Sequence, residues 1–384
     1  MWADYFRLAF RTFMTQKKRT ILTLIGIFIG IAAVVSLISL GQGLQDSIQG
    51  QFELMGSDKV FIQPGTGGGF NIAQTTKLTR KDLDGIRSVS GVDAASAMVY
   101  KISKVEYKGE IKYTWVMGME TTDQSFDQVI ESFGVEIEKG RGAEGTREAV
   151  LGYRYGIGDL FDKPVAVGDK FEIEGKKFKA VGSVSKIGNP QDDSQTYLPL
   201  EAALDVFDVD MDELDFIYVT VKDGEDPGTV AEKIKKALRK TRDVDEGDED
   251  FMVQTAQDFQ ETFGIILTIV QIILIGIAGV SLLVGGVNIA NTMYTAVMER
   301  TREIGVMKAI GARNNDVFMI FLIESGLLGL VGGIIGIVLG VGFGKLVSLI
   351  AEKGGWSIVQ TVFPWYLIAG ALAFSFVVGA LAGT

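Results

Sequence analysis

The 384-residue sequence contains neither cysteine nor histidine. Without cysteine no disulfide framework stabilises the fold, and nothing can be inferred about an oxidising compartment. The absence of histidine excludes Ser-His-Asp triads, histidine acid-base catalysis and the commonest metal ligand in proteins. We therefore assign no catalytic residue, no metal site and no cofactor bound by this chain.

Two short segments resemble ligand-binding motifs but lack a residue that each motif requires. The glycine-rich PGTGGGF, residues 64–70, has no Gly-Lys-Ser/Thr ending with which a P-loop binds phosphate and magnesium. The acidic DVDEGDED, residues 243–250, has its glycine one place too early for an EF-hand. We expect a mobile loop at the first segment and a solvated acidic loop at the second.

Long apolar runs are abundant. Four segments each hold roughly the ~20 apolar residues that a helix needs to cross ~30 Å of hydrocarbon, which argues against helices buried in a soluble core. The expected fold is therefore an α-helical membrane protein with four transmembrane helices. The helices are expected at residues 20–43, 263–294, 316–350 and 363–384.

The basic residues predict the orientation of these helices, because short translocated loops are poor in lysine and arginine. Lys353 is the only basic residue within residues 347–362, between the third and fourth runs. Basic residues are frequent before the first run and between the second and third: Arg7, Arg11, Lys17, Lys18, Arg19, Arg300, Arg302, Lys308 and Arg313. We expect a multi-pass protein of the plasma or inner membrane with both termini in the cytoplasm.

Residues 44–262 are then expected outside the cytoplasm as one large α+β domain between the first two spans. This segment holds most of the acid behind the net charge of −11, which argues against a nucleic-acid partner. Thr79 and Asp82 predict a capped helix start, and Lys-Gly and Glu-Gly pairs between alternating apolar residues predict two hairpins. The proline-free segments 41–56 and 254–263 predict helical stalks at both ends of the domain.

Residues 1–19 contain an aromatic stripe at helical spacing, with arginines off the stripe. This pattern is typical of an amphipathic helix in the lipid headgroup layer, although packing against other helices is an alternative. Membrane lipid is therefore an expected partner of this segment.

Glycines recur every fourth residue inside the apolar runs, a spacing that lets helix backbones approach closely in lipid. We expect the first-run pair to form the closest contact of a dimer. Glu324, an acid inside the third run, is interpreted as a structural hydrogen-bonding group rather than part of an ion path. The glycines assigned to packing or dimerisation are Gly26, Gly30, Gly332, Gly336, Gly340 and Gly344.

The segment MERTREIGVMKAIGARNNDV, residues 298–317, is short, charged and amphipathic. Its apolar face is expected to dock into a groove of a cytoplasmic partner, whereas a simple connection would need no such face. That face comprises Ile304, Met307, Ile310 and Gly311.

The same segment resembles the E-R-x-x-E-I-G-x-x-[KR]-A-x-G-A signature of MacB/FtsX-type permeases of ABC transporters. Weaker similarity extends over almost the whole chain. The resemblance implies that residues 298–315 form a coupling helix seated on a separate ABC ATPase subunit, which binds ATP and magnesium. The residues assigned to ATPase coupling are Glu299, Arg300, Glu303, Ile304, Met307, Lys308, Ile310, Gly311 and Arg313.

The resemblance further implies a non-catalytic permease subunit that pairs with a second subunit, identical or not. Such permeases act by mechanotransmission, in which ATP hydrolysis moves the extracytoplasmic domains to export or extract peptides, lipids, lipoproteins or antibiotics. An extracytoplasmic adaptor or substrate-delivery protein is a further expected partner. Family members usually carry a basic tail after span four, whereas this sequence stops at Thr384.

Two other functions remain open at this stage. A transmembrane signalling or scaffold protein that regulates an envelope enzyme would have the same spans. An ion-coupled secondary transporter would be expected to show inverted repeats and broken helices, and we find no convincing repeat.

Overall fold

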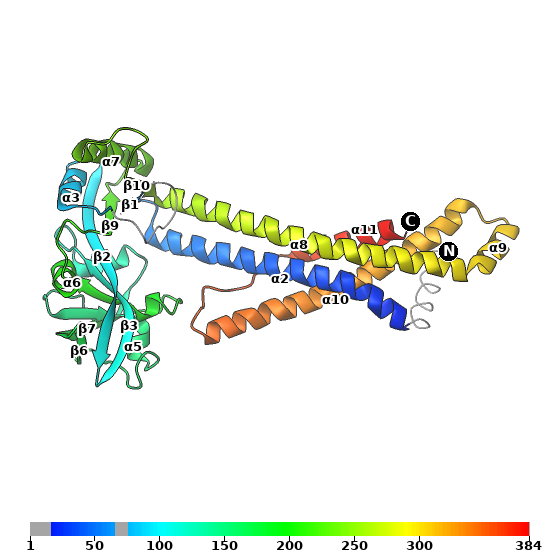
Figure 1. Cartoon of the computed structure of the whole chain (residues 1–384), viewed down its shortest axis with the longest axis horizontal. Helices are drawn as coiled ribbons and strands as arrows, with labels where there is room; N and C mark the ends of the chain where they lie inside the picture. Colours follow the sequence, from blue (N-terminus) through cyan, green and yellow to red (C-terminus); the bar gives the residue numbers. More distant parts are fainter. Residues whose placement is uncertain (1–16, 66–75, 384) are drawn as a thin grey trace. The chain divides into compact units, whose positions relative to one another are not determined.

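The computed structural model describes residues 17–65 and 76–383 (Figure 1). The expected interfacial helix 1–19 therefore lies outside the described residues except for its last three, and the glycine-rich segment 64–70 lies outside from residue 66 onward. The chain divides into two compact units. We call residues 1–46, 265–353 and 359–384 the helical unit, and residues 47–264 and 354–358 the sheet unit.

Four helices in the described part of the chain are long and apolar enough to cross a membrane, as the sequence predicts. The first three extend beyond the expected spans at both ends, and the fourth is shorter than expected. A short helix, α9 (Thr301–Ala309), lies between the second and third. The four are α2 (Lys17–Met55), α8 (Ala256–Glu299), α10 (Asn314–Lys353) and α11 (Trp365–Ala382).

Helices α2 and α8 continue without a break into the sheet unit, where the stalks are expected. The second stalk begins later than expected, because Gln254 and Thr255 belong to a strand. A reciprocal capping box starts α8 at that point: the Thr255 backbone N–H donates to the Asp258 carboxylate (2.7 Å), and the Asp258 N–H donates to the Thr255 hydroxyl (3.1 Å). The change from strand to helix is therefore fixed by local hydrogen bonds.

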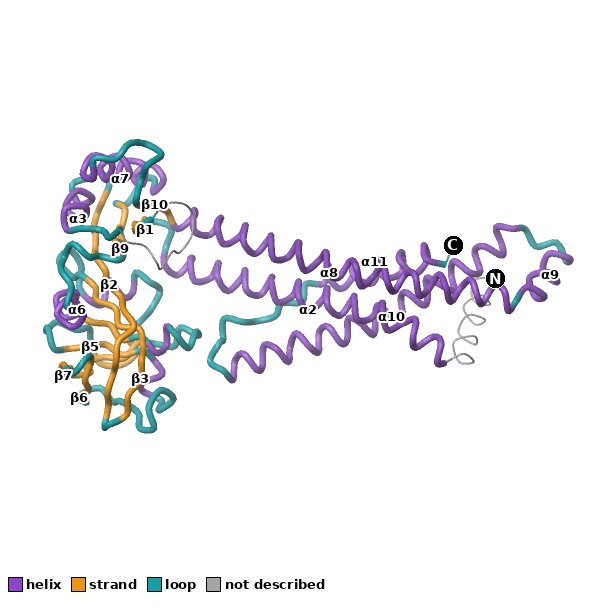
Figure 2. The backbone as a smooth tube through the Cα atoms, in the orientation of Figure 1, coloured by secondary structure: helices purple, strands orange, loops and turns teal. Residues whose placement is uncertain are grey.

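The described part of the sheet unit contains one mixed sheet of ten strands (Figure 2). Its order is β10-β1-β9-β2-β3-β8-β5-β7-β4, and β6 pairs with β2 and β7. The strands are β1 (Lys59–Pro64), β2 (Val92–Tyr107), β3 (Glu110–Met119), β4 (Ile137–Gly140), β5 (Glu148–Leu151), β6 (Lys170–Ile173), β7 (Lys176–Val184), β8 (Thr196–Pro199), β9 (Phe216–Val221) and β10 (Phe251–Thr255).

Two-residue turns produce both hairpins that the sequence predicts. Lys108 and Gly109 join β2 to β3, and Glu174 and Gly175 join β6 to β7. All four residues have positive φ, between 47° and 87°, as a type I′ turn requires. The twist of this turn matches the twist of paired strands, so the local sequence sets the strand register.

Helices cover the sheet over two separate cores. The larger core contains Leu83 and Ile86 of α3 and Ile234 and Leu238 of α7. The smaller core contains side chains of α4 together with Phe259, in the first turn of α8. The sheet-unit helices are α3 (Arg80–Arg87), α4 (Phe126–Glu131), α5 (Tyr153–Gly156), α6 (Leu200–Phe207) and α7 (Pro227–Arg242), with a 3-10 turn at Asp192–Ser194.

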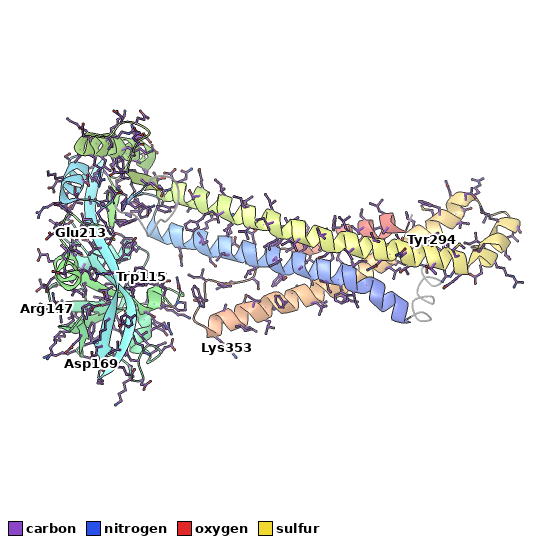
Figure 3. The ribbon with its side chains drawn as sticks, in the orientation of Figure 1. Trp115, Arg147, Asp169, Glu213, Tyr294 and Lys353 are labelled. Carbon is purple, nitrogen blue, oxygen red and sulfur yellow. The ribbon has the colours of Figure 1, made fainter. Side chains whose placement is uncertain are left out.

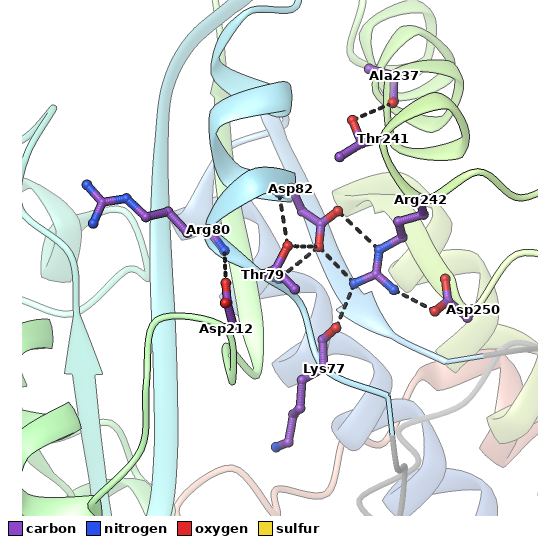
Figure 4. A network of polar contacts seen from close by, with 9 residues as sticks. All are labelled: Lys77, Thr79, Arg80, Asp82, Asp212, Ala237, Thr241, Arg242 and Asp250. Atoms are coloured by element: carbon purple, nitrogen blue, oxygen red, sulfur yellow. Dashed lines mark hydrogen bonds and ion pairs between the residues drawn. The ribbon is translucent and has the colours of Figure 1, made fainter.

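A largely buried ion-pair network joins α3 and α7 to Asp250, which directly precedes β10 (Figure 4). Arg242 donates to both oxygens of Asp82 (3.1 and 2.8 Å), to Asp250 (2.6 Å) and to the carbonyl of Lys77 (2.6 Å). Asp82 also forms the predicted capping box with Thr79 at the start of α3. Asp82 caps α3 and also accepts hydrogen bonds from Arg242 of α7. The network therefore specifies how these two helices pack on the sheet.

We expect Arg242→Met to destabilise the sheet unit by about 3–5 kcal/mol, because it leaves the buried Asp82 carboxylate without its cation. Hydrogen exchange of the α3 and α7 amides in the full chain measures the effect. Lys240→Met, at an exposed position of α7, is the matched control and should leave exchange unchanged. Equal exchange in both variants would contradict the structural role of the network.

Candidate functional site

The connection between α8 and α10 is a compact helix and two sharp turns. Helix α8 ends at Glu299, and Arg300, at φ −100° and ψ 14°, interrupts the helical path. The hydroxyl of Thr301 lies within hydrogen-bond distance of the carbonyls of Val297 (3.1 Å) and Met298 (2.8 Å), so its one hydrogen is shared between two acceptors at the end of α8. The chain therefore changes direction with its helix end capped.

A Schellman motif ends α9. The Ala312 N–H donates to the Met307 carbonyl (3.0 Å), and the Gly311 N–H donates to the Lys308 carbonyl (3.1 Å). Gly311 has φ +102°, which a residue with a side chain rarely adopts. The next helix starts at once, because the Arg313 N–H donates to the Asp316 carboxylate (2.9 Å).

An ion pair ties this connection to the third long helix. Arg300 donates to the Glu324 carboxylate at 3.2 Å, and Glu324 is 5% exposed. A buried carboxylate in an apolar helix is costly unless it is paired and hydrogen-bonded. The pair therefore accounts for Glu324 as a structural group, as the sequence predicts, and it fixes the start of the connection against α10.

Two of the four expected packing glycines of α10 lie where the backbone of another helix comes close. A Cβ at Gly336 would lie 2.8 Å from the carbonyl oxygen of Phe28, and one at Gly340 would lie 2.8 Å from that of Ala32. Gly332 faces Ile27 of the same helix α2, whereas Gly344 faces Phe363, before α11. These glycines are thus packing residues within the chain.

The first-run glycines also pack within the chain. A Cβ at Gly26 would lie 2.8 Å from the Cα of Gly285 in α8, and Gly30, one turn later, is buried. The space beside Gly26 is therefore occupied by a helix of the same chain. The expectation that Gly26 and Gly30 form the closest contact of a dimer stays a prediction, because repeat spacing identifies close packing but does not identify the partner helix.

Comparison with known proteins places this architecture in a family. Residues 20–237 match the MacB-like periplasmic core domain, and residues 262–384 match the FtsX-like permease C-terminal region. The chain belongs to the MacB/FtsX-type family of ABC transporter permeases. It is 39% identical to an uncharacterized ABC transporter permease of Methanocaldococcus jannaschii, over 99% of this chain and 93% of that protein.

Two further proteins are similar to this MacB/FtsX-type permease. The macrolide export ATP-binding/permease protein MacB of Bdellovibrio bacteriovorus is 30% identical over 99% of this chain, which covers 58% of that protein. The crystal structure of the periplasmic region of MacB from Actinobacillus actinomycetemcomitans is 14% identical, with a TM-score of 0.46, over 56% of this chain and 97% of that one.

The structure divides the permease's predicted coupling residues into two groups. Arg300, Ile304 and Met307 are partly buried, and Ile304 packs on the core of the helical unit. The others are exposed: Glu299, Glu303, Lys308, Ile310, Gly311 and Arg313.

The structure differs from the single helix that the expected docking face assumes. A continuous helix over 298–315 would place Ile304, Met307, Ile310 and Gly311 together, but α9 ends at Ala309 and the Gly311 turn redirects the chain. Its apolar surface is instead Val306, 59% exposed, and Ile310, 82% exposed. Val306 is not among the predicted coupling residues, although the spacing of Arg302, Val306 and Ile310 at i, i+4 and i+8 indicates a shared face.

Helix α8 carries exposed apolar side chains along its membrane segment, including Ile269, Ile273 and Leu283. Tyr294, near its C-terminal end, is exposed as well (Figure 3). In a membrane protein such a surface contacts lipid or another apolar helix.

We expect Arg300→Met to lower the thermal stability of the purified permease, because the buried Glu324 carboxylate loses a cation. The double variant Arg300→Met, Glu324→Gln should recover part of the loss, with a coupling energy of about 0.5–3 kcal/mol in a double-mutant cycle. Arg302→Met, at an exposed position of α9, is the control and should have no effect. Additive effects of the two substitutions would show that the pair is not coupled.

We also expect Gly336→Ala to destabilise the helical unit by about 1–3 kcal/mol, because the new methyl group overlaps the backbone of α2. Gly342→Ala in the same helix is the matched control, since no atom lies within 4 Å of a Cβ there. Unfolding of both variants in detergent by titration with SDS measures the difference. A loss of stability as large for Gly342→Ala as for Gly336→Ala would contradict the packing assignment.

Proposed function

We propose that this chain is a non-catalytic permease subunit that couples ATP hydrolysis by a separate ABC ATPase subunit to movement of its extracytoplasmic domain. The movement exports or extracts peptides, lipids, lipoproteins or antibiotics. The observation that carries the proposal is the compact α9 connection, joined to α10 by the Arg300–Glu324 pair, with Val306 and Ile310 exposed on its surface. ATP and magnesium bind to the ATPase, not to this chain.

An exposed apolar pair within a charged segment supports docking of α9 on that ATPase. Val306 and Ile310 supply apolar contact area, and the exposed Glu303 and Lys308 supply charges around it. Interface anchors typically consist of such an apolar centre with a polar rim. The lysine and arginine distribution favours a cytoplasmic location for this segment and both termini, where ATP is available.

Helix continuity supports mechanotransmission. Helix α2 has 39 residues, about 58 Å at ~1.5 Å per residue, which exceeds the ~30 Å of hydrocarbon. Helix α8 has 44 residues and starts directly from β10 through a capping box. A stiff helix transfers a displacement that a flexible linker would absorb.

A second permease subunit and membrane lipid are the neighbours that best fit the exposed apolar side chains of α8. The second subunit is identical or homologous. An extracytoplasmic adaptor or substrate-delivery protein would contact the sheet unit.

The docking proposal is tested with Val306→Asp, Ile310→Asp in the full chain, purified from its native membranes. The two carboxylates would be desolvated on docking, so the amount of co-purified ABC ATPase should fall at least about tenfold, equivalent to ~1.4 kcal/mol. Ile111→Asp, at an exposed apolar position of β3, is the matched control and should leave ATPase binding unchanged.

Undiminished ATPase binding by the double variant would contradict the docking surface. If the unsubstituted chain captures an envelope enzyme and no ABC ATPase, the permease proposal itself fails, and the signalling or scaffold function replaces it.

A further inference from the structure

The sheet unit contains a cavity of about 300 Å³. Its walls are mainly apolar and are formed by Met117 and Met119 of β3, Ile130 of α4, Phe133 after α4, and Ile187. A cavity of this size with apolar walls and a few polar groups is the usual form of a small-molecule site.

Two buried polar side chains line the cavity without a partner. Gln195 is 8% exposed and Tyr197 is 6% exposed. Within the described part of the chain, neither the Gln195 amide nor the Tyr197 hydroxyl makes a hydrogen bond, and neither is among the fully enclosed atoms that lack a partner, so both groups are reached from the cavity. Polar groups at a few positions of an otherwise apolar cavity fix the orientation of a ligand. A ligand that supplies the missing hydrogen bonds would therefore gain affinity from both groups.

A carboxylate beside these groups gives the cavity a charge preference. Asp192 lines the cavity and accepts one hydrogen bond on Oδ2, from the Asn189 amide (3.0 Å), whereas Oδ1 accepts none within the described residues. Burial raises the pKa of Asp192, and the charge of Asp193 acts in the same direction. A cationic group next to Oδ1 would offset the cost of holding this charge out of water.

Of the two neighbouring charges, Asp193 is already compensated within the protein. Asp193 accepts hydrogen bonds from the backbone N–H groups of Ile187 (2.7 Å) and Gly188 (3.1 Å). Lys186 also lines the cavity, but this lysine is an exposed residue. Asp192 is therefore the charged group best placed to bind an occupant.

We propose that this cavity binds a small amphiphile, with its apolar body among Met117, Met119 and Phe133 and a protonated amine beside Asp192. Gln195 and Tyr197 hydrogen-bond to its polar groups. Gln51 of α2 also lines the cavity, so the occupant contacts a helix that includes the first membrane span. That the amphiphile is exported or sensed by the permease rests on the proposed function. Binding of the amphiphile in the cavity does not require the ATPase.

The test uses the full chain in lipid nanodiscs without ATPase, with empty nanodiscs subtracted. Binding of 4-phenylbutylamine is measured by saturation-transfer difference NMR and compared with that of 4-phenylbutanoate, which has a similar apolar body and the opposite charge. We expect saturable amine binding and at least tenfold weaker carboxylate binding, because a second carboxylate would repel Asp192.

Two nearly isosteric substitutions then locate the site. Asp192→Asn should weaken amine binding about tenfold, and Tyr197→Phe about three- to tenfold, the effect of one lost hydrogen bond. The matched controls, Asp210→Asn and Tyr113→Phe, change exposed residues outside the cavity and should bind as the unsubstituted chain does.

Absence of saturable amine binding would overturn the inference, and so would equal binding of amine and carboxylate. Unchanged binding by both Asp192→Asn and Tyr197→Phe would place the amine elsewhere and overturn it as well. None of these results bears on ATPase docking at α9, so the proposed function would stand or fall separately.

Discussion

Close contact between helix backbones at glycine is the interaction on which the helical unit depends. In lipid, helices gain little from hiding apolar side chains, so association relies on packing and on interhelical polar contacts. Gly336 and Gly340 bring α10 against the backbone of α2, and Gly26 brings α2 against Gly285 of α8. Three of the long helices are thereby placed relative to one another, and the Arg300–Glu324 pair adds a fixed polar contact between α10 and the connection.

The same packing gives α2 and α8 a defined path before they enter the sheet unit. At its other end α8 is held by the Thr255–Asp258 capping box, and Phe259 is buried in the smaller core, with its ring 5.2 Å from that of Phe61. A helix anchored in this way has no flexible segment between itself and the sheet that could absorb a displacement. These contacts support the proposed transmission of movement along the helix axis.

Features determined by neighbouring residues could be predicted from the sequence. The four apolar helices need only length and composition, and the Thr79–Asp82 capping box and both hairpins need only a few adjacent residues. The end of α9 was wrongly placed, because Gly311 was interpreted as part of a helical face instead of a left-handed helix terminator.

Contacts between distant segments could not be predicted in this way. The sequence identifies Glu324 as an acid inside an apolar run, but its partner Arg300 lies 24 residues away and is expected at the ATPase instead. The cavity combines β3, the α4 region and β8, and β8 pairs in parallel with β3. Local sequence patterns do not determine which residues of two distant parallel strands lie side by side. The sequence therefore does not identify Gln195 and Tyr197 as cavity residues.

The most direct test of the central claim measures distances between the α2 and α8 helices of two subunits. Spin labels at Asp46 and Gln257 in each subunit report these distances by double electron–electron resonance, in nucleotide-free and ATP-trapped complexes with the ATPase. Mechanotransmission predicts that the distance distributions at both positions shift when ATP is trapped. Identical distributions with and without nucleotide, in a complex that hydrolyses ATP, would contradict it.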